Sequence, residues 1–203
     1  MPDVEFWKLC GSGIGEGFTP KPNTAVWAIL AVWPNEKSAR TAITEAAVYR
    51  RWRRRASESW TVFLSTQSAR GVWSGKSPFT ASEARQDGPM AVLTRATIKP
   101  TSLRHFWGQE PAISAAIGKN RDVLFKIGIG EVPLLHQVTF SIWPDARTMA
   151  DFARGDGPHA EAIRQVRAGG WFREELYARF HVLGSAGTWS GADPLAQPER
   201  TAA

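Results

Sequence analysis

Hydrophobic and polar residues follow one another in short blocks that predict alternating strands and helices. Residues 26–33 are apolar at every position, which is typical of a strand buried on both faces. Pro34 ends this strand, because proline cannot continue a hydrogen-bonded ladder. A helix is predicted at about 36–55 and another strand near 60–67, so the fold class is α+β.

The same succession of blocks returns in the second half of the chain and indicates an internal duplication. Gly13-Ile14-Gly15-Glu16 reappears as Gly128-Ile129-Gly130-Glu131, Trp33-Pro34 as Trp143-Pro144, and Trp73-Ser74-Gly75 as Trp189-Ser190-Gly191. The blocks keep their order and a nearly constant separation, from 13 to 128, from 33 to 143 and from 73 to 189. The second copy is predicted to have its helix at about 146–168 and its last strand near 177–184.

Between the two copies lie one more predicted strand, at 91–99, and a helix from Pro100 to about Ile117. Residues 90–191 therefore have the βαββαβ order of a ferredoxin-like unit. We expect two such repeats to pack sheet to sheet as an α/β barrel with an apolar interior. The expected parts are an incomplete first repeat at 1–79, a linker at 80–89, a complete second repeat at 90–191 and a loose C-terminal tail at 192–203.

The first repeat lacks its first strand and helix, since nothing in it corresponds to residues 90–118. One edge of a sheet is then expected to be open, and an open edge is usually covered. Two explanations are open: the chain has a late or variant start, or a second subunit of a homo-oligomer covers the edge. We favour the late or variant start.

Charge and cysteine content narrow the class of protein. The single cysteine, Cys10, excludes an internal disulfide framework and suits a reducing cytoplasm. No apolar run approaches the roughly 18 residues of a membrane-spanning helix, and the acidic N-terminus is unlike a signal peptide. The net charge of +6 favours an acidic partner, such as nucleic acid, an anionic membrane face or an anionic cofactor. The basic run 50–55 reads as a solvated helix end, and no nucleic-acid partner is expected, because most tryptophans lie in apolar runs.

Long stretches of the chain resemble the spheroidene monooxygenase family, also called acyclic carotenoid 2-ketolases. The matching stretches are 6–13, 59–64, 93–100, 123–131, 137–145, 156–160 and 174–180. The resemblance implies a haem-b-dependent monooxygenase of carotenoid biosynthesis, which hydroxylates C-2 of an acyclic carotenoid such as spheroidene twice to give the 2-keto product. It also implies that O₂ and electrons, from reduced ferredoxin or a similar donor, are consumed. A cytoplasmic protein with peripheral contact with the inner or photosynthetic membrane is the location expected from this resemblance.

Histidine, cysteine, methionine and tyrosine are the residues that hold haem iron. His159 shares a predicted helix face with Ile163 and Val166, so we expect it to be the iron ligand, the alternative being a buried histidine bonded to backbone or water. His136, on a strand face with Val138, is a second candidate, either as ligand or as a distal group near bound O₂, although we favour a capping role at the strand entrance.

The other candidate residues are a thiol, two histidines and two cations. Cys10 is the thiolate alternative for the iron, while His105 and His181 are expected to be solvated. Arg95 and Lys126, the latter taken as the equivalent of Lys8, are candidates for binding the haem propionates or else reach solvent.

Other functional interpretations stay open at this point. One is a cofactor-free oxygenase of the same fold, and another is a non-catalytic carrier of haem or a lipophile.

Overall fold

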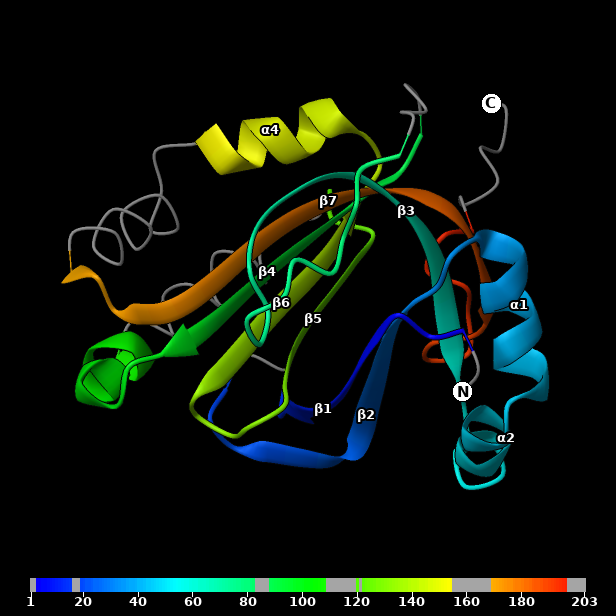
Figure 1. Cartoon of the computed structure of the whole chain (residues 1–203), viewed down its shortest axis with the longest axis horizontal. Helices are drawn as coiled ribbons and strands as arrows, with labels where there is room; N and C mark the ends of the chain where they lie inside the picture. The colour runs from blue at the N-terminus through cyan, green and yellow to red at the C-terminus, as the bar shows by residue number, and fades with distance from the viewer. Residues whose placement is uncertain are drawn as a thin grey trace, which may run out of the picture.

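The computed structural model describes residues 3–15, 19–82, 88–108, 120, 122–154 and 169–196, and its centre is a curled seven-stranded sheet (Figure 1). The strands have the order β2-β1-β5-β6-β4-β7-β3, and each described pair is antiparallel. The elements are β1 (Phe6–Gly13), β2 (Pro22–Val32), α1 (Glu36–Glu45), α2 (Ala47–Arg53), β3 (Trp60–Gly71), β4 (Met90–Ile98), the 3-10 helix η1 (Pro100–Ser102), β5 (Phe125–Gly130), β6 (His136–Trp143), α4 (Ala146–Arg154) and β7 (Phe172–Gly187).

Short side-chain caps start the helix that follows each Trp-Pro block. Asn35 accepts a hydrogen bond from the amide of Ser38 at 2.9 Å, and Asp145 accepts one from the amide of Thr148 at 2.7 Å. The first predicted helix, 36–55, is divided at Ala46, whose extended backbone separates α1 from α2. The helices predicted at 100–117 and 146–168 are seen to residues 108 and 154, and their remainders lie outside the described residues.

The strands of the second copy have the order β5-β6-β4-β7, which is the order of a ferredoxin-like βαββαβ unit. This arrangement confirms the topology expected for residues 90–191. The two copies are not stacked sheet on sheet, however. They are joined edge to edge into one sheet, because β1 pairs with β5 and β3 pairs with β7. The free edges of the sheet are therefore β2 and β3.

The register of β3 and β7 shows that a quasi-twofold axis relates the two copies. Trp60 pairs with Gly187, and Gly71 pairs with Leu176. Adding 116 to the residue numbers of the first copy converts 60 to 176 and 71 to 187. Exchanging the two copies therefore converts the Trp60–Gly187 pair into the Gly71–Leu176 pair. Ser65 pairs with its own counterpart, His181, so the axis passes through this pair.

The register corrects the alignment of the glycine blocks. Phe6 pairs with Val32 as Phe125 pairs with Ile142, which makes Phe6 the counterpart of Phe125. Counterparts in β1 and β5 are thus 119 positions apart, from 6 to 125, and Lys126 corresponds to Trp7 instead of Lys8. The repeated Gly-Ile-Gly-Glu letters are 115 positions apart, from 13 to 128, and therefore do not occupy equivalent places. The register of β1 and β2 also shifts at Gly11/Ser12, where residues 24–26 of β2 have no partner in β1.

The hydrophobic core fills the concave side of the sheet. The buried members of its main cluster come from both copies: Phe6, Cys10, Trp73, Ala91, Leu93, Phe125, Ile127, Ile129, Val138, Ile142, Leu176, Ala178 and Phe180. Phe79 packs edge-on against Phe180, with ring centroids 5.0 Å apart, so the segment after β3 also contributes to the core. Asp193 accepts hydrogen bonds from Trp60 Nε1 and Ser185, which anchors the start of the expected tail 192–203.

Candidate functional site

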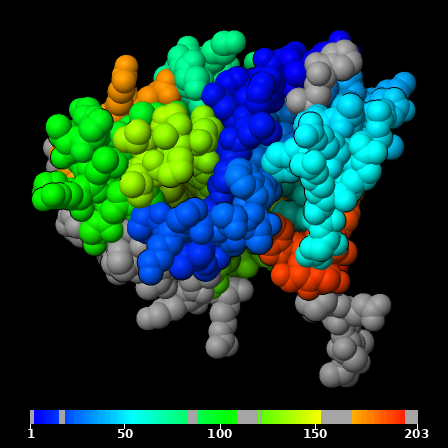
Figure 2. All heavy atoms as spheres, turned by 90° about the horizontal axis from the view of Figure 1, so that it is seen from below, coloured from blue at the N-terminus to red at the C-terminus, as the bar shows by residue number. Residues whose placement is uncertain are grey.

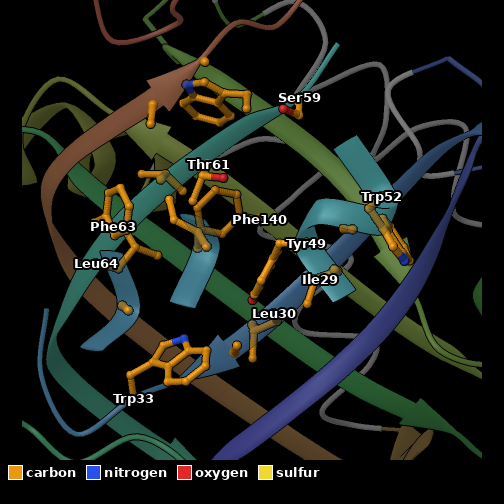
Figure 3. Close-up of a pocket in the computed structure, with 18 of the residues that line it drawn as sticks. Ile29, Leu30, Trp33, Tyr49, Trp52, Ser59, Thr61, Phe63, Leu64 and Phe140 are labelled. Carbon is orange, nitrogen blue, oxygen red and sulfur yellow. The ribbon is translucent and has the colours of Figure 1, made fainter. Parts of the chain in front are cut away.

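A cavity of about 2380 Å³ extends from the concave side of the sheet to the space between β2, β3, α1 and α2. Its inner wall is apolar and is formed by Leu93, Phe125, Ile127, Ile129, Phe140 and Phe180. Figure 3 shows residues of β2, α2, β3 and β6 that line it, with Leu30 and Tyr49 directed toward one another.

The volume of the cavity follows from the open sheet. Pockets for small ligands usually measure roughly 300 to 1,000 Å³. Here the interior of the sheet merges with the opening between β2 and β3, because these two edge strands are not joined. Three aromatic side chains that line the cavity contact one another: the rings of Trp60 and Phe125 are 4.7 Å apart, and those of Phe125 and Trp189 are 5.2 Å apart. Such walls suit a long or flat apolar ligand.

The basic run of α2 lies at the rim of the cavity and is partly used within the protein. Arg53 donates a hydrogen bond to the carbonyl of Thr44 at 3.0 Å and another to that of Ile43, while Arg50 donates to Glu45. These guanidinium groups thus satisfy carbonyls at the end of α1, as expected for cations near a helix C-terminus. Burial raises the pKa of Tyr49, which lines the cavity near them.

A network of polar side chains surrounds the buried Trp73. Its indole Nε1 donates a hydrogen bond to Glu131 at 2.7 Å. Lys8 lies 3.4 Å from the same carboxylate and donates to Ser74 at 2.6 Å, and His136 Nδ1 is 3.3 Å from Glu131 Oε2. One carboxylate therefore binds an indole and an ammonium and lies beside an imidazole, with which Glu131 Oε2 makes no hydrogen bond.

Arg95 and Glu174 form the second part of this network. The guanidinium of Arg95 is buried and ion-paired with Glu174, and it lies over the Trp73 ring with its Cζ 5.6 Å from the centroid. Glu174 also accepts hydrogen bonds from the backbone amides of Ser74 at 3.0 Å and Gly75 at 2.7 Å. A carboxylate of the second copy thus holds the Trp-Ser-Gly turn of the first copy.

The symmetry-related contact is present as well, with a carboxylate of the first copy holding the Trp-Ser-Gly turn of the second copy. Glu58 is the counterpart of Glu174 and accepts hydrogen bonds from the amides of Ser190 at 2.8 Å and Gly191 at 2.7 Å. Gly71 and its counterpart Gly187 precede the two turns and both have positive φ. A Cβ at either glycine would meet a backbone carbonyl, which explains why glycine recurs there.

Burial and charge shift the pKa values of this region in different directions. Burial by itself would raise the pKa of Glu174, but the amides of Gly75 and Ser74 and the charge of Arg95 together lower it. Burial lowers the pKa of His136, and the charge of Glu131 opposes this change. Burial, aided by the charge of Glu131, raises the pKa of the Cys10 thiol to about 12. Cys10 is therefore a protonated core side chain at neutral pH, which disfavours it as a thiolate ligand.

The sequence-predicted site residues do not converge on one place in the described structure. Arg95 faces the interior beside Leu93, whereas Lys126 alternates with Phe125 and Ile127 and faces the other side of β5. The two cations therefore do not meet as a pair. His159, the first candidate for the iron ligand, lies outside the described residues.

The three described histidines differ in environment. His105 is exposed, as expected, and His136 lies in the Glu131 network at the start of β6. The expectation that His181 is solvated is wrong, since 7% of the residue is exposed. Its side chain shares a face of the sheet with that of its partner Met90, which packs with Trp143 and Met149 in a second buried cluster.

The cavity fits part of what haem requires. Its apolar walls suit the macrocycle, and two of the side chains that line it, His181 and Tyr49, are of kinds that can bind iron. His181 Nε2 is buried without a hydrogen-bond partner, although His181 lies on the face of β7 opposite Phe180. No cluster of three or more metal-binding side chains is found within the described part of the chain. The described residues thus provide a place for a large apolar group and one unpartnered imidazole at its edge.

Sequence reasoning missed Glu131, Glu174 and His181. The duplication contained a signal for one of them, since Glu58 and Glu174 stand two residues before the counterparts Trp60 and Leu176. Nothing local indicates that Glu131 binds Trp73, because the two residues are joined only by the fold.

Three curated proteins are similar to the chain over nearly its whole length. They are the spheroidene monooxygenases of Cereibacter sphaeroides (57% identity over 97% of this chain and 61% of that protein), Rhodobacter capsulatus (54% over 96% and 82%) and Rubrivivax gelatinosus (33% over 94% and 73%). The chain thus spans less than two thirds of the first of these proteins. No family model matches the chain. Among solved structures, a candidate monooxygenase of Fusobacterium nucleatum is a distant match, with a TM-score of 0.47 and 12% identity over 92% of this chain and 79% of that chain.

Proposed function

Because the chain belongs to the spheroidene monooxygenase family, we propose that it inserts oxygen at C-2 of an acyclic carotenoid such as spheroidene. The observation that carries this proposal is the 54% identity to the Rhodobacter capsulatus protein over 96% of the chain. The large aromatic cavity supports it, because a polyene is long, apolar and polarizable. No helix in the described part of the chain is long and apolar enough to cross a bilayer.

The proposed reaction converts a methylene group to a ketone in two hydroxylations. Each step inserts one atom of O₂ into a C–H bond and reduces the other atom to water with two electrons and two protons. The second step gives a geminal diol, which loses water to leave the 2-keto carotenoid. In sum, R–CH₂–R with two O₂, four electrons and four protons gives R–CO–R and three H₂O, and reduced ferredoxin or a similar donor supplies the electrons.

The chain's own residues bind the polyene and exclude water. Phe125 and Phe140 form the inner wall, and Trp60 packs against Phe125, so the carotenoid can lie along aromatic faces. A dry wall also protects a reactive oxidant from side reactions with solvent. The polar network around Trp73 fixes the turn at one end of the sheet and leaves the apolar wall free for the substrate.

We also propose that haem b is the cofactor and that it supplies the activation of O₂. His159 is proposed as the iron ligand. The described alternatives are His136, whose Nδ1 is buried and makes no hydrogen bond with a described residue, and His181, whose Nε2 is likewise unpartnered and which lines the cavity. An imidazole in an apolar setting needs either a hydrogen-bond partner or a metal, which makes these residues testable.

Absorption spectroscopy of the protein expressed with haem supply tests this part of the proposal. We expect a Soret band that is lost in His159→Ala and kept in His105→Ala, the exposed control. Loss of the band in His181→Ala alone would transfer the ligand role to His181. A protein without a Soret band that still oxidises the carotenoid would be a cofactor-free oxygenase. Haem binding without carotenoid turnover would indicate a carrier.

A further inference from the structure

The two free edges of the sheet mark a place that is filled in the second copy. β6 and β7 both pair with β4, which lies between them. Their counterparts in the first copy are β2 and β3, the two edge strands. No described strand pairs with both of them to fill the gap between the two edges. Both edge strands line the cavity, so the position equivalent to β4 is the opening itself.

The registers define where an added strand would lie. Leu93 of β4 pairs with Phe140 on one side and Ala178 on the other. The counterparts of these two residues are Leu30 and Val62, and both line the cavity. A strand antiparallel to β2 and β3 would thus place its Leu93-like residue between Leu30 and Val62, pointing into the apolar interior.

A second observation is the exposed apolar face of β1 and β2. Trp7 is 51% exposed, Leu9 44% and Trp27 59%, and the registers put all three on the outer side of these strands. Figure 2 shows this face, with β1 and β2 in blue. In the second copy the segment after β4 contacts the β5–β6 end of the sheet: Trp107 donates a hydrogen bond to the carbonyl of Leu134 at 3.0 Å, and the Phe106 and Phe172 rings are 5.9 Å apart. A helix that follows an added strand would start at the equivalent β1–β2 end, beside the exposed face, and exposed apolar side chains of this kind mark interaction sites.

A third observation is the charge at the opening. Glu174 binds both the turn amides and the buried Arg95 of β4. Its counterpart Glu58 binds the equivalent turn amides and lines the cavity, but no salt bridge of Glu58 is found within the described residues. The missing cation is the one that a β4-like strand would carry.

We propose that the opening between β2 and β3, together with the exposed face of Trp7, Leu9 and Trp27, is a docking surface for one strand–helix unit of the same kind as residues 90–118. The strand joins β2 to β3 and presents a cation to Glu58, and the helix covers the exposed face. The unit would close the sheet into an eight-stranded barrel and enclose the cavity. The Cereibacter sphaeroides relative contains residues outside its aligned 61%, so a protein of this family has room for such a unit.

A fusion protein tests this docking surface without any assay of oxygenation. A second copy of residues 89–118 is joined by a flexible linker to Met1 of the full chain, since these residues already fill the equivalent place. Hydrogen exchange is then measured for residues 26–32 and 60–65, beside acrylamide quenching of tryptophan emission. We expect exchange in both edge strands to slow by about tenfold or more, and quenching to fall as Trp7 and Trp27 become covered.

Two matched fusions and the unfused chain complete the experiment. Leu93→Asp in the added copy alone is expected to remove the protection, because a carboxylate would face the apolar interior. Arg95→Ala in the added copy alone is expected to weaken it. Exchange in the fusion equal to that of the unfused chain, or equal protection by the Leu93→Asp fusion, would overturn the proposal. So would light scattering that shows the unfused chain as a dimer with both edges already protected, because the occupant would then be a second copy.

Discussion

Replacing Glu174 by glutamine isolates the ion pair with Arg95. One Glu174 oxygen accepts from Arg95 and Ser74, and the other accepts from Gly75. Glutamine keeps one acceptor but places an NH₂ group where a donor already points, and it removes the charge opposite a buried guanidinium. Glu58→Gln is the matched control, because Glu58 binds the equivalent turn without an arginine.

The expected loss follows from the burial of Arg95. Removing one partner of a buried ion pair costs about 3 to 5 kcal/mol. We expect Glu174→Gln to lower the free energy of unfolding by about 3 kcal/mol, the lower end of that range, because 18% of the Glu174 side chain is exposed. With a urea m-value of about 2 to 3 kcal/mol/M, the midpoint falls by roughly 1 to 1.5 M. The Glu58→Gln midpoint should move much less.

Acidification provides a second readout of the same pair. Since the folded-state pKa of Glu174 is lowered, its contribution to stability is complete above the unfolded pKa of about 4.3 and is lost as the pH falls through the folded value. The difference between the parent protein and Glu174→Gln should therefore shrink below about pH 4.3. Urea unfolding followed by circular dichroism at several pH values measures both effects. Equal losses in Glu174→Gln and Glu58→Gln at pH 7, or a difference independent of pH, would refute the assignment of this pair.

A substitution of Trp73 and a labelling reaction of Cys10 test two buried side chains. Trp73→Phe removes the 2.7 Å hydrogen bond to Glu131 and should cost about 1.5 to 3 kcal/mol in urea unfolding, whereas Trp189→Phe, at the 36% exposed counterpart, should cost clearly less. Equal costs would mean that the bond to Glu131 contributes nothing. Cys10, with 1% exposure and a pKa of about 12, should react with a thiol reagent at pH 8 only as fast as the protein opens. Labelling at the rate of the unfolded chain would contradict this burial.

Much of the topology could be predicted because it depends on local signals. The apolar run 26–33, the prolines that end such runs and the repeated Trp-Ser-Gly turns mark elements and their order. The order β5-β6-β4-β7 follows from the βαββαβ succession. These features need no knowledge of what lies across the fold.

The remaining features depend on long-range pairing. The letters Phe6-Trp7-Lys8 and Phe125-Lys126 suggested Lys8 as the counterpart of Lys126, but the pairing of β1 with β2 and of β5 with β6 makes Trp7 its counterpart. His181 looked solvated by alternation alone, but it shares a face of the sheet with Met90, which packs in a second buried cluster with Trp143 and Met149 of α4. The joining of two sheets by their edges also cannot be read from either repeat, because each edge pairs with the other copy.

The proposed activity is tested most directly by oxygen labelling. The protein loaded with haem is incubated with spheroidene, reduced ferredoxin and ¹⁸O₂, and the carotenoid product is analysed by mass spectrometry soon after mixing. We expect a 2-keto carotenoid that carries one ¹⁸O atom and is 16 mass units heavier than the substrate, 14 from the exchange of CH₂ for C=O and 2 from the isotope. A product whose oxygen comes from water, or spheroidene recovered unchanged from protein that binds both haem and carotenoid, would contradict the proposed monooxygenase.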